Sequence, residues 1–381
     1  MSQVAHYPCE QCGAQLEFAP GATDLVCPYC GHRSAIAVPT TVVEELALDQ
    51  FLDRAHLNWE LEQGKVVHCN SCAAEFTLPP DQETQTCPFC GSHVVVPINN
   101  EERIPPNGVL PFVITGARAR FAMGEWLGSR FWAPRDLKRM ALKEGSLKGI
   151  YVPFWTFDSR TITDYTGQRG EHYWVTVTYT AVENGRPVTR TRQERRTRWY
   201  PAAGTVHVPF DDVTVQASSA VPSRYAEGFS DWDLPAVVPY NPQYLVGFQT
   251  MRYELDLSQG LQIGRDRMQP GIDSAIRYDI GGDEQMILTK NTQYFDNTFK
   301  LLLLPIWTGA YRYRGKPFRV LINGRTGDVR GEAPVSFWKV LLAVILGLSV
   351  AGGIFYAYQE SQRRSQSSSV QTDYVPDYPI R

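Results

Sequence analysis

The stretch HYWVTVTYTAVENGRPVTRTRQERRTR, residues 172–198, decides the fold class of this chain. Apolar and polar residues alternate from His172 to Val182, which is the period of a β-strand. Asn184-Gly185 then supplies two residues that adopt positive φ easily, as a two-residue hairpin turn requires. The alternation returns from Pro187 to Arg198. The sequence therefore predicts an antiparallel hairpin.

Strand and helix patterns extend outward from this hairpin on both sides. Further strands are expected at 109–114, 206–215, 249–257, 286–294, 299–313 and 318–322, and helices at 115–131, 134–145 and 259–278. The first helix is expected to be capped by Thr115 and to face the core with Ala119, Met123, Trp126, Leu127 and Phe131. Pro270 is expected to break or bend the third helix. The prediction for residues 101–335 is an α+β body in which antiparallel sheet dominates.

Two short segments of this body resemble each other. YVPFWT occupies residues 151–156 and LLPIWT occupies residues 303–308. The similarity allows two interpretations: the body consists of two related halves, or two edge strands share a Pro-x-Trp bend.

Eight cysteines form two sets with the spacing C-x2-C-x14-C-x2-C, displaced by sixty residues: Cys9, Cys12, Cys27 and Cys30, then Cys69, Cys72, Cys87 and Cys90. Two thiolates on one tight turn can hold a metal ion, and two such knuckles supply four sulfurs in a tetrahedron. The pattern predicts two zinc ribbons, at 1–40 and 65–100, joined by a helical spacer at 41–64. Four cysteines leave no coordination position for water or substrate. Two structural zinc ions are therefore expected.

The charge of the cysteine-rich region argues against contact with nucleic acid. Residues 1–100 hold three basic residues (Arg33, Arg54 and Lys65) against twelve acidic ones, a formal charge of −9. Each zinc bound by four thiolates carries a charge of −2, which makes the segment about −13 with both sites filled. Binding of nucleic acid begins with neutralised phosphates. These ribbons are therefore expected to bind protein.

An apolar run near the C-terminus predicts one transmembrane helix, at 337–358, followed by a short polar tail at 359–381. The N-terminal residues lack the pattern of a signal peptide. Thiols are normally kept reduced in the cytosol, so the large N-terminal part with its eight cysteines is expected to be cytosolic. We therefore expect a single-pass, tail-anchored protein of the cytoplasmic (inner) membrane. Gly347 with Ala351, and Ser349 with Gly353, have the small-xxx-small spacing that favours helix–helix association.

The returning strand of the hairpin carries the most prominent charge cluster. In extended geometry Arg190, Arg192, Arg196 and Arg198 share one face. One interpretation is a surface site for an anionic ligand, either lipid headgroups or RNA. The other is a solvated strand whose arginines pair with acids such as Glu171 or Asp211.

Catalytic motifs do not occur in the sequence. There is no phosphate-binding GxxxxGK[ST] loop, no HExxH, no GxSxG and no GxGxxG after a strand. An uncharacterised hydrolase remains an interpretation, and it requires His172 or His207 to meet carboxylates in a cleft.

The order of these parts resembles a known family. Twin CPxCG ribbons, a body containing GIYVPFWTFD and YRYRGKPFRVLINGRTGDVRG, and one span resemble bacterial membrane-anchored TFIIB-type zinc-ribbon-containing proteins. Some of these also carry the name primosomal protein N-prime (replication factor Y), a superfamily II helicase. The absence of a phosphate-binding loop argues against helicase activity here. The resemblance implies partners among envelope-stress proteins of the phage-shock and SPFH types, and of functional residues it carries over only the eight cysteines.

Taken together, the sequence favours a non-enzymatic, zinc-binding adaptor that binds protein partners at the cytoplasmic membrane face. The alternative is a membrane-tethered nucleic-acid-binding protein that uses the arginine-rich strand.

Overall fold

The structure is a computed structural model that describes residues 7–14, 16–37, 43–52, 65–69, 75–78, 95–98, 104–144, 146–183, 186–218, 221–226, 228–229, 232–251 and 253–367. The chain divides into two compact units. The first consists of Met1–Met123, Ser146–Ala310 and Arg319–Gly331, and the second consists of Gly124–Gly145, Tyr311–Phe318 and Glu332–Arg381.

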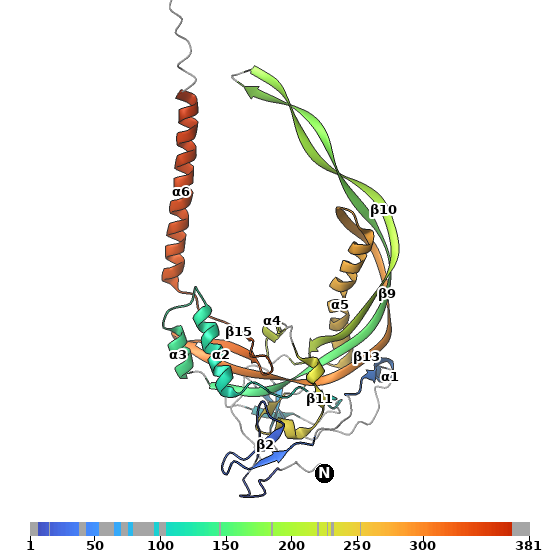
Figure 1. Cartoon of the computed structure of the whole chain (residues 1–381), viewed down its shortest axis with the longest axis vertical. Coiled ribbons are helices and arrows are strands. Elements are labelled where there is room, and N and C mark those ends of the chain that lie inside the picture. Colours follow the sequence, from blue (N-terminus) through green and yellow to red (C-terminus); the bar gives the residue numbers. More distant parts are fainter. Residues whose placement is uncertain are drawn as a thin grey trace, which may run out of the picture. The chain divides into compact units, whose positions relative to one another are not determined.

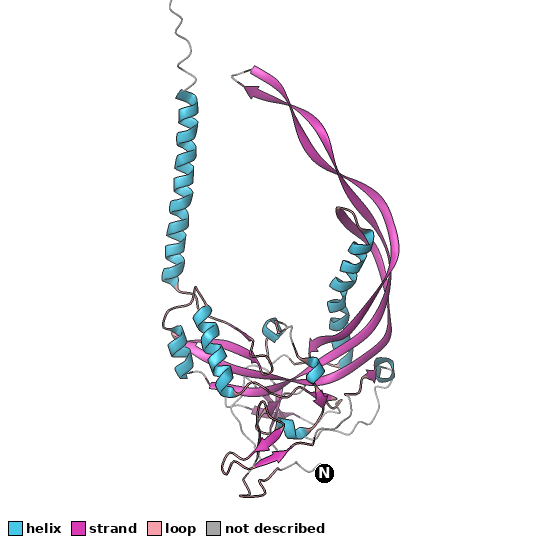
Figure 2. Ribbon diagram, in the orientation of Figure 1, coloured by secondary structure: helices cyan, strands magenta, loops and turns pink. Residues whose placement is uncertain are grey.

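Three long strands build the main sheet: β9 (Ser146–Glu183), β10 (Arg186–Gln216) and β13 (Glu284–Tyr313) (Figures 1 and 2). β9 lies between β10 and β13 and is antiparallel to both, and the strand order is β10-β9-β13-β14-β15. Shorter strands complete the sheet: β4 (Leu46–Ala47), β8 (Gly108–Val109), β11 (Val238–Pro239), β12 (Gln249–Thr250), β14 (Lys316–Asn323) and β15 (Val329–Gly331). The α+β class with a dominant antiparallel sheet is confirmed.

The predicted hairpin is the distal part of the β9–β10 pair. Glu183 pairs with Arg186 next to the turn. β13 pairs with β9 from Ser146 only as far as Gly170. Residues 171–183 and 186–198 therefore form a two-stranded ribbon, called the hairpin extension below, which continues past the end of α5 in Figure 1. The strands predicted at 206–215, 286–294 and 299–313 lie within β10 and β13 rather than standing alone.

Within the described ranges, the helices are α1 (Leu48–Leu52), α2 (Gly116–Ser129), α3 (Leu137–Glu144), α4 (Ser223–Ala226), α5 (Leu257–Ile280) and α6 (Phe337–Ser367), with two 3-10 helices, η1 (Leu234–Ala236) and η2 (Pro242–Leu245). Two small antiparallel sheets lie in the cysteine-rich region: β1 (Glu17–Phe18), β2 (Asp24–Val26) and β3 (Arg33–Ala35), then β5 (Lys65–Cys69), β6 (Glu75–Leu78) and β7 (Val95–Ile98).

Near residues 150–157 of β9 the sheet is buried on both faces, and successive side chains alternate between two cores. Phe154 belongs to one core, together with residues of η1 and α4, whereas the neighbouring Trp155 belongs to a second core, together with residues of α5. α5 approaches the sheet closely because Gly260 and Gly264 face it. A Cβ atom at Gly260 would lie 2.7 Å from Trp155, and one at Gly264 would lie 2.8 Å from Phe157.

The starts of α5 and α2 follow their local sequence. Asp256 accepts a hydrogen bond from the Gln259 backbone (2.8 Å), and the Gln259 side chain accepts one from the Asp256 backbone (3.3 Å), which is a capping box. Thr115 caps α2 through its hydroxyl, which accepts a hydrogen bond from the Arg118 N–H. Of the two effects expected of Pro270, the break does not occur, since α5 continues through this residue; the bend stays a prediction.

Other expectations from the sequence need correction. Phe131 was expected to face the core, but α2 ends at Ser129 and Phe131 is 73% exposed. The strand expected at 249–257 extends only over Gln249–Thr250, and that at 109–114 only over Gly108–Val109. In the spacer expected to be helical, Leu46 lies in β4 and α1 covers only Leu48–Leu52, while residues 53–64 lie outside the described residues.

The two similar segments at 151–156 and 303–308 are direct neighbours in the sheet. Leu304 pairs with Val152, and Pro305 pairs with Tyr151. These strands are central rather than at an edge, because β10 and β14 flank them. The existence of two related halves stays a prediction.

Candidate metal centre

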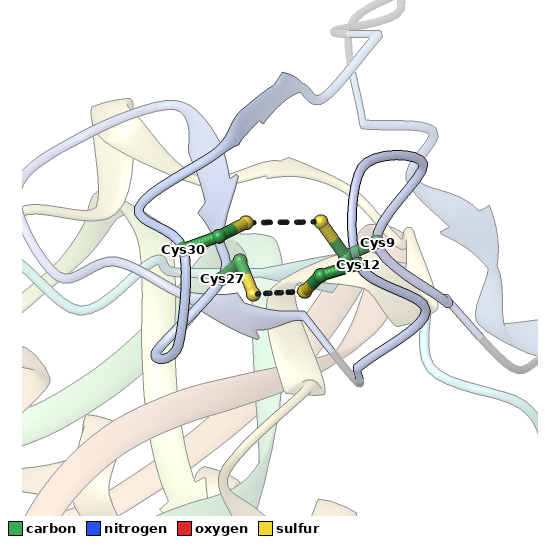
Figure 3. A group of neighbouring side chains, drawn as sticks. All are labelled: Cys9, Cys12, Cys27 and Cys30. Atoms are coloured by element: carbon green, nitrogen blue, oxygen red, sulfur yellow. Dashed lines mark hydrogen bonds between the residues drawn. The ribbon is translucent and has the colours of Figure 1, made fainter.

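The first cysteine set comes together as its spacing predicts. The Sγ atoms of Cys9 and Cys30 lie 3.5 Å apart, and those of Cys12 and Cys27 also lie 3.5 Å apart (Figure 3). All four sulfurs lie within 4.8 Å of one another. Because a disulfide bond is about 2.05 Å long, these are free thiols. Four close thiols are compatible with a zinc ion.

Both knuckles have the same backbone geometry. The Cys9 N–H donates to Ala14 O (2.7 Å), and the Cys27 N–H donates to His32 O (2.8 Å). One residue after the second cysteine of each knuckle stands a glycine, Gly13 or Gly31, with a φ of 73°. Only glycine adopts this left-handed conformation without a steric cost, which explains the CxxCG pattern.

The four thiols are electrostatically unequal. N–H groups of Cys30 and Tyr29 donate hydrogen bonds to the Cys27 sulfur, and with the neighbouring thiols they lower the pKa of Cys27 to about 6 despite its burial. Cys30 also receives a hydrogen bond from His32. Burial and the other three thiols nevertheless raise the pKa of Cys30 to about 12. Cys27 therefore ionises more readily than Cys30, and a bound cation would favour the thiolate form of both.

The cysteine knuckles are anchored to the body of the first unit by β1 and the turn after it. The Phe18 N–H donates to Val246 O (3.0 Å), and the Phe18 ring packs edge-on against Tyr244 with ring centres 5.3 Å apart. The Gly21 N–H donates to Phe112 O (2.9 Å). Tyr29, between the two cysteines of the second knuckle, is 83% exposed.

Of the second cysteine set, only Cys69 belongs to the described residues. Cys69 ends β5, whereas Cys72, Cys87 and Cys90 lie outside the described residues. One backbone feature recurs sixty residues apart: Leu16 donates to Tyr7 O in the first set, and Phe76 pairs with Val67 in the second. The second zinc site stays a prediction.

The arginines of the returning strand lie on one face of the hairpin extension. Arg190, Arg192, Arg196 and Arg198 are exposed and pair across the sheet with Tyr179, Val177, Tyr173 and Glu171. The guanidinium of Arg192 lies 5.7 Å from the centre of the Tyr179 ring, and that of Arg198 lies 4.9 Å from the Tyr173 ring. Glu194 lies 3.8 Å from Arg192 and 3.9 Å from Arg196. Glu171 instead forms its ion pair with Arg169, at 2.6 Å.

The hydrolase interpretation requires a histidine beside carboxylates in a cleft, and His172 lies beside two carboxylates, those of Asp283 (3.8 Å) and Glu284. His172 Nε2 lies 2.7 Å from Glu284 Oε1, and this hydrogen bond lowers the pKa of Glu284. The pair lies where β13 begins beside β9. Neither His172 nor His207 lines the cavity described next.

Sequence reasoning missed a cluster around a buried lysine. Lys300 lies 2.8 Å from Asp212, 3.0 Å from Glu45 and 3.8 Å from Asp158. Carboxylate oxygens of Asp158, Asp211 and Asp212 lie within 4.8 Å of one another, which is close enough to hold a metal ion. Lys300, Glu45 and Asp212 also line a cavity of about 290 Å³ whose other walls are apolar. The one sequence signal was a lysine inside the apolar run FKLLLLP, residues 299–305.

The apolar C-terminal helix is a candidate membrane span. Within the stretch Phe337–Glu360 of α6, the most apolar window has a mean hydropathy of 2.3, and none of this window is buried within the described residues. A Cβ atom at Gly347 or Gly353 would meet no neighbouring atom within 4 Å. The small residues at 347, 349, 351 and 353 therefore lie on an open helix surface.

Comparison with known proteins adds one relative. No family model matches this chain, and no solved structure matches it. The chain is similar to YdjG of Bacillus subtilis (strain 168), an uncharacterized protein, with 24% identity over 361 residues. This similarity covers 93% of this chain and 96% of that protein, so it runs over nearly the whole length of both.

Proposed function

We propose that this chain is a zinc-binding, membrane-anchored adaptor without enzymatic activity, which binds protein partners at the cytoplasmic face of the membrane. The observation that carries the proposal is the exposure of the hairpin extension. Every described residue of 171–182 and 186–200 is exposed or only partly buried, including Trp174 (66% exposed) and Val182 (74% exposed).

A long two-stranded ribbon needs a covering partner. An isolated hairpin is marginally stable in water, and independent stability requires a third strand or a packed helix. Among the described residues, β10 is an edge strand and β9 has no neighbour but β10 beyond Gly170. A protein that adds a strand at these edges, or that packs on the Trp174 side, would supply the missing support.

The metal contribution rests on the first cysteine set. Zinc–sulfur bonds of about 2.3 Å place the sulfurs of a tetrahedron about 3.8 Å apart, close to the two spacings of 3.5 Å. Four thiolates from Cys9, Cys12, Cys27 and Cys30 would close the coordination sphere. The zinc would then hold the two knuckles together and keep the Tyr29 tip in place.

The membrane contribution rests on α6. An apolar helix whose most apolar window is not buried within the described residues suits a lipid environment. Reduced cysteines favour a cytosolic location for the first unit, with the span at 337–358 in the cytoplasmic membrane. Gly347, Ala351, Ser349 and Gly353 would allow a second transmembrane helix to approach closely.

Crosslinked co-purification from intact membranes tests the proposal. Replacing Trp174–Arg195 by Asn-Gly would close the shortened hairpin on the Tyr173–Arg196 pair, in the same register as the native turn. This variant is expected to remain in the membrane and to lose the partners. Tyr278→Ala, a matched control on the exposed surface of α5 (91% exposed), is expected to keep them.

Two outcomes would contradict the proposal. Partners that remain bound after removal of the hairpin tip would show that the extension is not the docking surface. A variant without α6 should keep the same partners but release them into the soluble fraction, and unchanged membrane localisation of those partners would argue against an anchoring role. The family resemblance supports phage-shock and SPFH-type proteins as the first partners to look for.

Nucleic-acid binding is a second candidate because four exposed arginines share one face of the extension. The major groove of B-DNA admits a two-stranded β-ribbon. Glu194, between Arg192 and Arg196, weakens this candidate because it offsets part of their charge. Salt-dependent binding of DNA or RNA, lost when all four arginines are changed to glutamine, would favour it over the adaptor.

A further inference from the structure

The loop between α2 and α3 is tied to the first turn of α6 within the second unit. The Ser336 N–H donates to Trp132 O (2.7 Å). The Lys339 ammonium donates to Phe131 O and to Ala133 O, each at 2.8 Å. These three bonds hold residues 130–133, called the aromatic loop below, beside the start of the candidate span.

The aromatic loop and the helix start expose four large rings. Phe131 is 73% exposed and Trp132 is 44% exposed, and their ring centres lie 5.1 Å apart. Phe337 is 70% exposed and Trp338 is 75% exposed, with ring centres 5.8 Å apart. Exposed rings are costly in water, and here they gather at one end of an apolar helix. Aromatic rings are enriched at the headgroup level of membranes, where one edge is apolar and the other is wet.

The charged groups around these rings suit the same location. The Lys339 ammonium, at the start of an apolar helix, is satisfied by two carbonyls and lies 5.6 Å from the centre of the Phe131 ring. Other basic side chains of this unit are exposed: Arg130, Arg135, Arg139, Arg312, Arg314 and Lys316. Cationic side chains near a membrane surface are attracted to anionic lipid headgroups.

From this arrangement we infer that the aromatic loop is a second membrane contact, which lies in the lipid headgroup region on the side where α6 begins. The inference rests on the proposed membrane span, because the hydrogen bonds to Ser336 and Lys339 place the loop at the level of the helix start. The loop and the helix start would together fix the orientation of the second unit on the bilayer.

Quenching of tryptophan emission by brominated lipid tests the inference. The full-length protein is placed in nanodiscs of phosphatidylcholine with 20% phosphatidylglycerol, with or without bromine at positions 6 and 7 of one acyl chain. Trp132→Phe and Trp338→Phe are compared with Trp174→Phe, which removes an exposed tryptophan of the hairpin extension. If Trp132 and Trp338 are the two interfacial tryptophans, each of the first two variants should lose about half of the bromine-dependent quenching, and Trp174→Phe should lose none.

The outcomes separate the inference from the proposed function. Unchanged quenching in Trp132→Phe, with reduced quenching in Trp338→Phe, would overturn the second contact and leave the span intact. Unchanged quenching in both variants would overturn the span as well. The substitutions conserve an aromatic ring at exposed positions, so they should leave the fold unaltered, and near-UV circular dichroism checks this.

Discussion

Replacing Lys300 by methionine should destabilise the first unit through the carboxylates that surround the ammonium. Lys300 is 8% exposed, and its ammonium contacts Asp212, Glu45 and Asp158 at 2.8, 3.0 and 3.8 Å. Burial alone would lower the pKa of Lys300, but the three acids outweigh it and raise the pKa above its usual value. The lysine is therefore charged at neutral pH and compensates the acids.

The expected decrease in the free energy of unfolding can be estimated from the exposure of these acids. Breaking a fully buried ion pair costs about 3–5 kcal/mol because one charge is left uncompensated. The Asp158 side chain is only 13% exposed, but those of Asp212 and Glu45 are 27% and 46% exposed, so water screens them. We expect the free energy of unfolding to fall by about 2–4 kcal/mol, which lowers the midpoint of thermal unfolding by about 3–6 °C.

The stability lost in Lys300→Met should depend on pH, and the pKa of Asp158 determines in which direction. Burial raises the pKa of Asp158 despite a hydrogen bond from the Asp212 N–H and the attraction of Lys300. Without Lys300 this pKa rises further. A carboxyl whose pKa is higher in the folded state contributes stability below its unfolded pKa and loses it as pH rises through the folded pKa. The difference in stability between the wild type and Lys300→Met should therefore be larger at pH 8 than at pH 5.

Thermal unfolding of the full-length protein in detergent, followed by tryptophan fluorescence, measures both effects. Lys290→Met is the matched control, because Lys290 pairs with Asp273 at a more exposed position and should shift the midpoint by less than about 2 °C. A deficit for Lys300→Met that is no larger than that of the control, or that is equal at pH 5 and pH 8, would refute the reasoning. So would stabilisation of the wild type by millimolar Ca²⁺ or Mg²⁺, because the aspartates would then hold a metal ion in place of the lysine.

Three further predictions follow from the cysteines, α5 and the arginines. Metal analysis should find two zinc ions per chain and about one in Cys27→Ala, and acid should release zinc because protons compete for the thiolates; one zinc or none in the wild type would contradict the two-ribbon prediction. Gly260→Ala should lower thermal stability by about 1–3 kcal/mol because the added methyl meets Trp155 at 2.7 Å, whereas Ser274→Ala on the exposed side of α5 should have little effect. If the protein is an adaptor, filter binding at 150 mM salt should detect no RNA or DNA, and changing all four arginines of the extension to glutamine should leave partner capture unchanged.

The sequence predicted features whose causes are local. Asn184-Gly185 and the alternating residues around it are sufficient to predict the hairpin, and the two CxxCG turns are sufficient to predict the four-thiol cluster. The capping position of Thr115 could also be predicted, because the hydrogen bond joins residues only three positions apart.

Features that depend on contacts between distant residues could not be predicted. Pro270 remains inside α5 because that helix is held against Trp155 and Phe157, so tertiary packing outweighs the cost of one missing N–H. The cluster around Lys300 joins residues from β4, β9, β10 and β13, and no spacing in the sequence relates them. Phe131 followed the helical period, yet the helix ends before it, and its ring remains exposed.

The pairing of β9 on its two sides implies an order of folding. Thr161 meets Val208 of β10 at a separation of 47 residues, whereas Thr163 meets Thr292 of β13 at a separation of 129 residues. Closing the longer loop is slower, because more chain entropy is lost before any contact forms. The β9–β10 pair should therefore form first from its turn, and the arrival of β13 should limit the folding rate. Until then the inner edge of β9 is open to strands of other chains, so aggregation during refolding should start there.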